Sequence, residues 1–549
     1  MKKYLLLPIF LVLGVIFLTG GCSDSSYVSG NNNIVTNEIG LPEVAIEDRV
    51  KNKEFQLLNE EAPVPPMCYT KTEGVNNPCY VCHQIYTPNE EYRVNKLNDG
   101  GLQGGYLFSD IGTVNHWKNL FVDRSTWNKK ITDKQILHYI NQENYTSLVD
   151  ELNANPNWKG FIPDLNDYQL SAKAFDSQGM ALDGSGWVAF NYKPLPSTFW
   201  PTNGSTDDVV IRLPQKFRQI QGKLNNQIYL INLSLVELNI KQLESISIPE
   251  TNEILLNLDL NGDQQITQKV STLVKRSQFV GDATDVVLVA QQFPEGTEFM
   301  HSVRYVGVDD KEQIHVPPRM KELRYMKKIK TLTDDELTAR YARERKEKFL
   351  EELPSYVNHH DKGMSNGMGW LLQGFIENYD GSLREQNLEE KMFCMGCHAA
   401  IGTTIDQTFS FARKIEGAKG WGYINLKGMQ DTPSVSQYEG EILQYLKLSG
   451  GGNEFRENDE MLARWFNSDG SVNEESVKSA DVYQLITPSK ERALALNKAY
   501  THIVRHQSFI FGRDATIYPV INVHKNVDES EPPLQKNSRL FGWDIRIKQ

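Results

Sequence analysis

The sequence predicts an α+β protein of several domains, with mainly helical domains at both ends flanking a β-rich central domain. The chain of 549 residues, 40% hydrophobic and 23% charged, has ordinary globular composition and is too long for one compact core. Short β-type segments gather in residues 181–330. Helical patterns occur on both sides, so we expect the flanking regions to span residues 46–180 and 331–549.

The first 22 residues predict an export signal. Two lysines follow Met1, and an apolar run extends from Tyr4 to Leu18. That run is too short to span a membrane as a helix. The small residues before Cys22 resemble a bacterial lipobox, in which the signal is cut ahead of a cysteine that carries a diacylglycerol, although Thr19 is unusual at its position. An ordinary cleaved secretory signal is the alternative.

A polar stretch follows the cysteine, and we expect residues 23–45 to form a flexible tether. Ser23, directly after Cys22, resembles outer-membrane sorting in Gram-negative bacteria. The expected location is therefore the bacterial envelope, with a lipid anchor in the outer membrane, on its periplasmic or surface face. The 58 basic and 70 acidic residues give a formal net charge of -12, so we expect no nucleic-acid partner.

Two copies of the pattern Cys-x-x-Cys-His occur 315 residues apart, counted from Cys79 to Cys394. This spacing places two thiols where they can form thioethers with the vinyl groups of one haem, and sets the imidazole beneath the iron. A Cys₄ zinc site and two redox dithiols use the same thiols. Neither explains a histidine after each pair, and export also favours haem c. The attachment residues and proximal ligands are Cys79, Cys82 and His83, and Cys394, Cys397 and His398.

On the signal and these two motifs, the chain resembles exported dihaem c-type cytochromes carried on a lipoprotein. The resemblance implies two haem c groups, one in each flanking region, and electron transfer in the periplasm or at the cell surface. The partners would be redox proteins or a small redox substrate. More distantly, the chain resembles bacterial dihaem peroxidases, in which one haem has an open site for peroxide or oxygen. A third interpretation makes the β-rich region a binding domain for a redox partner or a polymer.

The individual elements follow from local patterns. A helix is predicted over Asp133–Gln142, with Thr132 or Asp133 at its start. The capping box that begins at Thr333 predicts a charged helix to about Leu353, ended by Pro354. The region from about Asp361 is expected to be helical around the second motif. The strands predicted for the central domain are 208–211, 228–231, 254–256 and 286–289.

A candidate calcium loop lies in the β-rich region. Its oxygen-bearing side chains alternate along the chain, with an apolar residue at the eighth position, and resemble an EF-hand loop. Gln264 replaces the usual glycine, and Val270 stands where the bidentate glutamate would be. A polar hairpin turn is the alternative. The candidate ligands are Asp259, Asn261, Asp263, Gln265 and Thr267.

The sixth ligand of each iron decides between electron transfer and an enzyme. Two strong protein ligands favour electron transfer, whereas an open sixth site favours binding of peroxide or oxygen. The candidate distal ligands near the first motif are His116 and His138. The candidate for the second motif is Met429, in a loop downstream. His360, in a polar cluster upstream of the second motif, could serve either haem or lie in a solvated loop. The sequence identifies no catalytic residue.

Overall fold

The computed structural model describes residues 40–51, 57–71, 76, 112–350, 352–399, 405–434, 438–450 and 458–527. The described residues from Leu41 onwards belong to one compact unit. The export signal with Cys22, and the first motif with Cys79, Cys82 and His83, lie outside the described residues.

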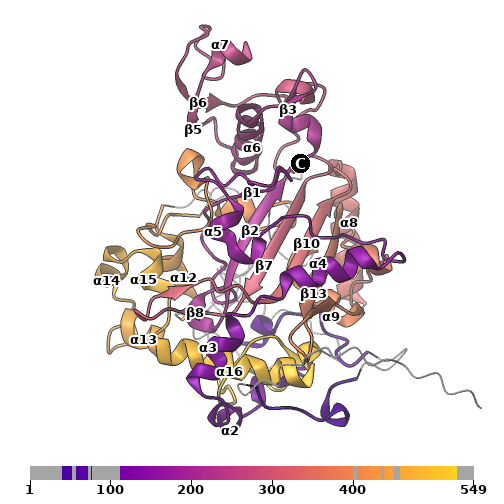
Figure 1. Ribbon diagram of the computed structural model, residues 1–549, viewed down its shortest axis with the longest axis vertical. Helices are drawn as coiled ribbons and strands as arrows, with labels where there is room; N and C mark the ends of the chain where they lie inside the picture. Colours follow the sequence, from indigo (N-terminus) through magenta and orange to yellow (C-terminus); the bar gives the residue numbers. More distant parts are fainter. Residues whose placement is uncertain are drawn as a thin grey trace, which may run out of the picture. The chain divides into compact units, whose positions relative to one another are not determined.

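An antiparallel sheet occupies the centre of this compact unit (Figure 1). Eight strands of the described residues pair in the order β1-β2-β7-β10-β13-β12-β11, and β14 pairs with β13. The strands are β1 (Val188–Ala189), β2 (Thr206–Arg212), β7 (Glu298–Arg304), β10 (Met320–Lys328), β11 (Val357–Asn358), β12 (Met364–Ser365), β13 (Trp370–Glu377) and β14 (Leu383–Glu385). The described part also holds three two-stranded sheets: β3 (Gln219–Ile220) with β4 (Lys223–Leu224), β5 (Ser245–Thr251) with β6 (Val270–Val274), and β8 (Gly307–Val308) with β9 (Ile314–His315).

The register of the long strands places His301, Arg324 and their neighbours on one face of the sheet. His301 of β7 pairs with Val209 of β2 and with Arg324 of β10. Met326, two residues after Arg324, pairs with Phe299 on one side. Because side chains alternate between the faces of a strand, all five residues face the same way.

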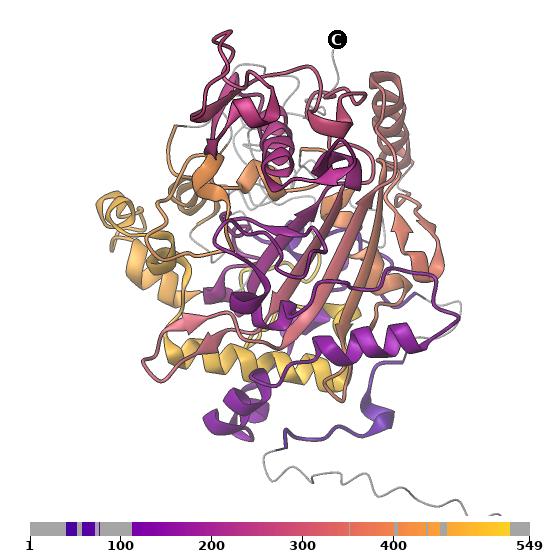
Figure 2. The ribbon, with the colours of Figure 1, turned by 45° about the horizontal axis from the view of Figure 1, so that its top comes forward.

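Helices cover both faces and one end of this sheet (Figure 2). Helix α6 (Asn226–Lys241) packs in one core with Phe299 and Met326, whereas α4 (Tyr145–Ala154) packs against Met300 on the other face. The long helix α16 (Lys490–His506) shares a third core with α3 (Asp133–Ile140). The remaining α-helices of the described part are α2 (Ser125–Lys129), α5 (Ser171–Ala174), α7 (Glu253–Leu256), α8 (Asp334–Phe349), α9 (Leu388–Met392), α10 (Met395–His398), α11 (Ser410–Arg413), α12 (Glu441–Ser449), α13 (Asp459–Trp465), α14 (Glu474–Ser479) and α15 (Val482–Ile486).

The protein is α+β, but the predicted helical haem domains at both ends of a β-rich centre are wrong. Strands β13 and β14 come from the predicted C-terminal region and pair in one sheet with β2, β7 and β10 from the predicted centre. The second Cys-x-x-Cys-His motif accordingly lies against this shared sheet and not inside a separate helical domain. Long-range strand pairing, which leaves no local pattern in the sequence, unites the two regions.

Several predicted elements are confirmed. Helix α3 begins with a capping box, in which Thr132 Oγ1 accepts from the Gln135 amide (3.2 Å) and Gln135 Oε1 accepts from the Thr132 amide (2.9 Å). The run 208–211 lies in β2. Helix α8 follows the Thr333 capping box and ends at Phe349, four residues before the predicted end.

Three predicted strands are wrong. Residues 228–231 lie in α6 and residues 254–256 in α7, while 286–289 belong to none of the strands in the described part. Helix α6 is buried on every side from Ile228 to Lys241, so it has no polar face to give the sequence a helical period. Its first turn is instead specified by Asn225, whose side chain accepts from the Ile228 amide.

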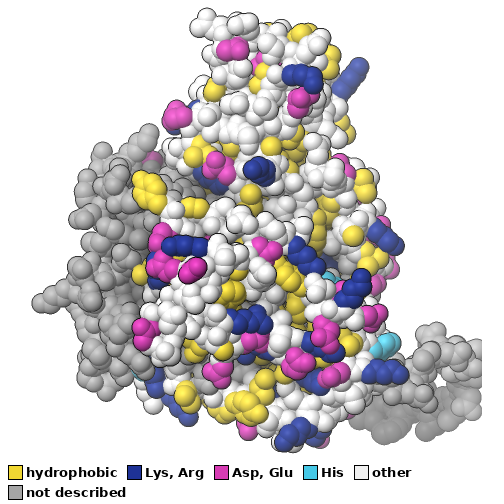
Figure 3. Space-filling view, turned by 90° about the vertical axis from the view of Figure 1, so that its left-hand side faces the viewer, with side chains coloured by type: hydrophobic (Ala, Val, Ile, Leu, Met, Phe, Trp, Pro, Cys, Tyr) yellow, Lys and Arg dark blue, Asp and Glu magenta, His cyan; other side chains and the backbone are white. Residues whose placement is uncertain are grey.

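The surface carries charges of both signs. On the face shown in Figure 3, Lys and Arg side chains are interspersed with Asp and Glu. A search of the described helices for one long and apolar enough to cross a bilayer finds none.

Candidate cofactor site

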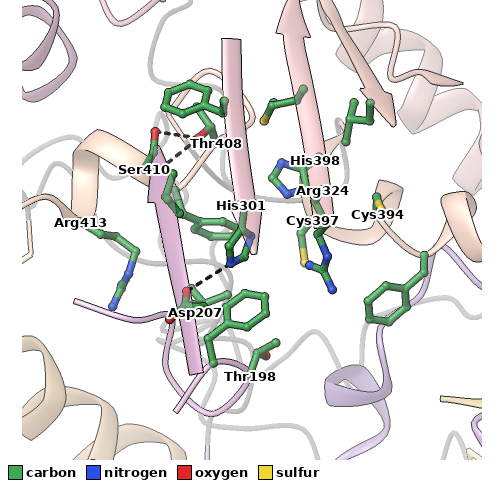
Figure 4. Close-up of a pocket in the computed structure, with 18 of the residues that line it drawn as sticks. Thr198, Asp207, His301, Arg324, Cys394, Cys397, His398, Thr408, Ser410 and Arg413 are labelled. Carbon is green, nitrogen blue, oxygen red and sulfur yellow. Dashed lines mark hydrogen bonds and ion pairs between the residues drawn. The ribbon is translucent and has the colours of Figure 1, made fainter. Parts of the chain in front are cut away.

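The second Cys-x-x-Cys-His motif borders a cavity, shown in Figure 4. The cavity is partly open to solvent. Small-molecule and cofactor sites commonly have mainly apolar walls. Apolar side chains from several elements line this cavity: Pro65, Pro66, Met67, Leu195, Phe199, Val209, Phe299, Met326, Leu372, Phe393 and Phe409.

A single turn of helix presents the motif to the cavity. The backbone amides of Cys397 and His398 both donate to the carbonyl of Cys394, at 3.2 and 3.0 Å. This turn, α10, follows directly after α9, which begins with a capping box formed by Asn387 and Glu390. Both cysteines and the histidine border the cavity. Burial raises the pKa of the Cys394 thiol, an effect that the nearby guanidinium groups partly offset.

His398 has a fixed ring orientation and a neutral ring. Its Nδ1 lies 2.7 Å from the carbonyl oxygen of Gln407, so Nδ1 carries the proton and donates it, which leaves the Nε2 lone pair available. Burial lowers the pKa of His398 to about 4, and the positive charge of Arg324 contributes in the same direction. A neutral imidazole whose other nitrogen donates to a carbonyl is the form in which histidine binds metals.

The carbonyl that orients His398 belongs to an unusual turn. Asp406 and Gln407 are both fully buried and both adopt left-handed backbone conformations, with φ of 54° and 57°. Such conformations cost about 1–3 kcal/mol each for residues other than glycine. The carboxylate of Asp406 accepts from Lys328 Nζ at 2.6 Å and from the amide of Phe293 at 2.9 Å. These contacts hold the turn in place.

The sheet provides a polar group on the wall formed by β2, β7 and β10. The side chain of His301 is 18% exposed, and its Nε2 lies 3.3 Å from Oδ2 of Asp207 on β2. The ring of Phe199 packs edge-on against His301, with 4.9 Å between the centroids. Beside it, Arg324 Nε donates to Glu322 at 2.9 Å. Figure 4 shows the side chains of His301, Arg324 and His398 around one space.

A second cavity adjoins the first. It encloses about 1000 Å³ of empty space, part of it open to solvent, and shares Phe199 and Asp207 with the first cavity. Its other walls include His315 and Tyr423. Burial, followed by the charge of Asp208, raises the pKa of Tyr423 well above its usual value, so its hydroxyl stays protonated.

Two of the four predicted distal ligands, His116 and His138, concern the first motif, which lies outside the described residues, so they stay predictions. His138 is exposed on α3 and pairs with Gln142 at 2.9 Å, and His360 is exposed. Met429 is half-buried and packs in the core around α12–α15, and His116 is half-buried. None of the four is among the described residues that line the cavity.

Sequence reasoning did not select His301, which stands 97 residues before His398 in the chain. The available signal was its position in the segment 299–303, where a polar imidazole interrupts a run typical of a buried strand. No pattern in the sequence identifies Gln407, because it acts through its backbone carbonyl, which every residue type carries.

The candidate calcium loop forms a turn stabilised by its own backbone. Asp259 accepts from the amides of Gly262 (2.7 Å) and Gln264 (2.9 Å), and Asp263 Oδ1 accepts from the amide of Gln265 (2.8 Å). Gln264 has a φ of 65°, the conformation for which glycine is usual at this position. A carboxylate oxygen that accepts one hydrogen bond keeps a second lone pair for a cation.

In this loop Asn261 donates to Asp263 at 3.0 Å, and Thr267 donates to Glu253 through its amide and hydroxyl. Among the described residues, no group of three or more His, Cys, Asp and Glu side chains is arranged to hold a metal ion. Calcium binding by this loop stays a prediction.

Comparisons with known proteins give a family. A family model described as "-like lipoprotein" matches residues 51–484. An uncharacterized lipoprotein of Aquifex aeolicus (strain VF5) is 31% identical over 518 residues, which cover 83% of this chain and 86% of that protein. No solved structure matches the chain.

Proposed function

Because the chain belongs to this family of lipoproteins, which places it in the cell envelope on a lipid anchor, we propose that it is a c-type cytochrome that transfers electrons there. In this proposal Cys22 carries the lipid, and the anchor lies in the outer membrane. One haem c is held by Cys394, Cys397 and His398, and a second by the first motif at residues 79–83.

One observation carries the proposal: a neutral, oriented His398 and two thiols border the same apolar cavity. In c-type attachment, the thiols of Cys394 and Cys397 would hold the haem as thioethers, and Nε2 of His398 would be the ligand to the iron. The proton stays on Nδ1, which donates it to the carbonyl of Gln407, so the ring would need no rearrangement. The residues present therefore fit the group.

The bound haem would supply one-electron chemistry, and the protein sets its environment. The apolar side chains of Phe299, Met326 and Leu372 exclude water from that wall of the cavity. The guanidinium of Arg324 places a positive charge beside both cysteines, and its partner Glu322 offsets that charge. Redox proteins or a small redox substrate are the proposed partners.

A second candidate function is an enzyme that activates peroxide or oxygen at one open haem. The adjoining cavity favours it, because it shares Phe199 and Asp207 with the first cavity and offers space for a small molecule next to it. For the first haem, His116 and His138 remain the proposed distal ligands.

The test is the amount of haem that stays attached after denaturation. We expect two haems per chain in the wild-type protein from a host that matures c-type cytochromes, and one in Cys397→Ala. Cys68→Ala is the matched control, because Cys68 is a half-buried thiol outside both motifs, and it should keep two. Equal haem content in Cys397→Ala and wild type would overturn the proposal.

A further inference from the structure

We propose that His301 is the sixth ligand of the haem held at Cys394, Cys397 and His398. This inference rests on the proposed function, because it requires a haem in the cavity. It assigns an axial ligand to a residue of the central sheet, 97 residues before His398. Neither of the ligands suggested by the sequence for this haem, Met429 and His360, borders the cavity.

The first argument is the position of the two imidazoles. His301 and His398 come from different elements, β7 and α10, and both border the cavity. A flat cofactor that is attached to α10 and bound by His398 would present its other face to another wall of the same cavity.

The second argument is that each ring has an oxygen beside one of its nitrogens. His398 Nδ1 donates to the carbonyl of Gln407, and Nε2 of His301 lies 3.3 Å from Oδ2 of Asp207 without forming a hydrogen bond in this structure. Metal-binding histidines characteristically donate their second ring N–H to a carboxylate or a carbonyl. In the proposed complex Asp207 would take that place for His301.

The third argument is the surroundings of His301. On the cavity-facing side of the sheet its neighbours are Val209, Phe299 and Met326, which are apolar, and Arg324. Arg324 is paired with Glu322 and carries no lone pair for a metal. His301 is thus a polar ring in a mainly apolar wall, with the buried carboxylate of Asp207 3.3 Å from its Nε2, which suits a role as a ligand.

Met326 is the competing ligand, since its thioether lies on the neighbouring strand and borders the same cavity. It packs in the same core as Phe299 and Leu372, where a methionine is an ordinary filler, and no described polar group orients it. His301 has such a group in Asp207. The geometry therefore favours the imidazole.

Asp207 acts as a positioning residue in this proposal. A carboxylate that accepts from a ligating imidazole raises its basicity, which stabilises the oxidised iron. Asp207→Asn weakens this effect, so we expect the midpoint potential of this haem to rise while its spin state stays low. A merely structural role for Asp207 would leave the potential unchanged.

The experiment measures spin state by electron paramagnetic resonance on the full-length oxidised protein, with haem content determined on the same samples. His301→Ala should add one equivalent of high-spin iron per chain relative to wild type, with two haems still attached. Comparison with wild type removes the contribution of the first haem. Met326→Leu, which removes the thioether but conserves volume, should leave the spectrum unchanged. So should His359→Ala, which removes an exposed imidazole.

A further variant distinguishes loss of the ligand from misfolding of the protein. His301→Met supplies another ligand at the same place, so we expect this haem to stay low-spin with a higher midpoint potential. Two haems with an unchanged spectrum in His301→Ala would overturn the assignment of His301 and leave the proposed function standing. High-spin iron produced by Met326→Leu would overturn it as well. A wild-type protein without haem at Cys394 and Cys397 would overturn the proposed function itself.

Discussion

The ammonium group of Lys328 lies 2.6 Å from Oδ1 of Asp406, and both side chains are completely buried. Asp406 is followed by Gln407, whose carbonyl accepts from Nδ1 of His398. The ion pair therefore joins strand β10 of the central sheet to the turn that orients the histidine of the motif. Two left-handed residues in sequence would be costly without such a contact.

Replacing Lys328 should destabilise the protein strongly. Lys328→Met leaves the carboxylate of Asp406 buried without its counter-charge, which costs about 3–5 kcal/mol in comparable sites. Urea unfolding measures the loss. The matched control is Lys269→Met, because Lys269 pairs with Glu250 at the surface, where the side chains are 75% and 63% exposed. We expect less than about 1 kcal/mol there. Similar effects of the two substitutions would contradict the account.

Glu322 should make the free energy of unfolding depend on pH. Burial alone raises its pKa, but Arg324 and Arg513 outweigh burial and lower the pKa to about 2. Its carboxylate accepts from Arg324 at 2.9 Å and from Arg513 at 2.6 Å. Because the folded-state pKa is depressed, the unfolded state binds more protons below pH 4.5, and stability falls as the pH drops towards 2. The contribution at neutral pH is about 3 kcal/mol.

Urea midpoints measured from pH 2 to 7 test this contribution. Glu322→Gln should flatten the pH dependence between pH 2 and 4.5, whatever its effect on stability at neutral pH. If the urea midpoints of Glu322→Gln changed with pH in the same way as those of wild type across this range, the pKa of Glu322 would not be depressed in the folded protein.

The loop at residues 259–267 should respond to calcium. Calcium at 100 times its dissociation constant stabilises a protein by about 2.7 kcal/mol, which calorimetry detects as a higher melting temperature. Asp259→Asn should remove this response. Asp309→Asn is the control, because Asp309 also accepts from two backbone amides, those of Lys311 and Gln313, in a turn outside the loop. A melting temperature that is the same with calcium and with chelator would identify the loop as a polar hairpin turn.

The first motif should bind a haem of its own. Cys82→Ala removes one thioether position, and we expect the pyridine haemochrome assay to fall from two haems per chain to one. The variant should keep the absorption of the haem at Cys394 and Cys397. Two haems in Cys82→Ala would sink the assignment of His83 as a proximal ligand.

Local patterns predicted the local elements. The capping boxes at Thr132 and Thr333 mark the starts of α3 and α8, because a cap satisfies amides within four residues of itself. Helix α6 escaped prediction since its polar residues are buried too. Asn232, for example, donates to the carbonyls of Phe217 and Val280, so this polar residue does not indicate a solvent-exposed face of the helix. Strands β13 and β14, which follow residue 330, join one sheet with β2, β7 and β10, which precede it. This pairing depends on contacts between segments far apart in the sequence.

The site also combines residues that local spacing predicts with residues that depend on distant contacts. The spacing of Cys394, Cys397 and His398 predicts their chemistry because all three lie on one turn of helix. The partners of that turn come from elsewhere in the chain: the carbonyl of Gln407 through the turn held by Lys328, and His301 through the register of β7. Contacts set by register or by a backbone carbonyl cannot be derived from spacing.

The most direct test of the central claim is mass spectrometry of the peptide that contains Cys394–His398, from protein exported in a host that matures c-type cytochromes. The account predicts that this peptide carries one haem, linked through both cysteines. The same peptide with two unmodified thiols, from a host that attaches haem to other exported cytochromes, would contradict it.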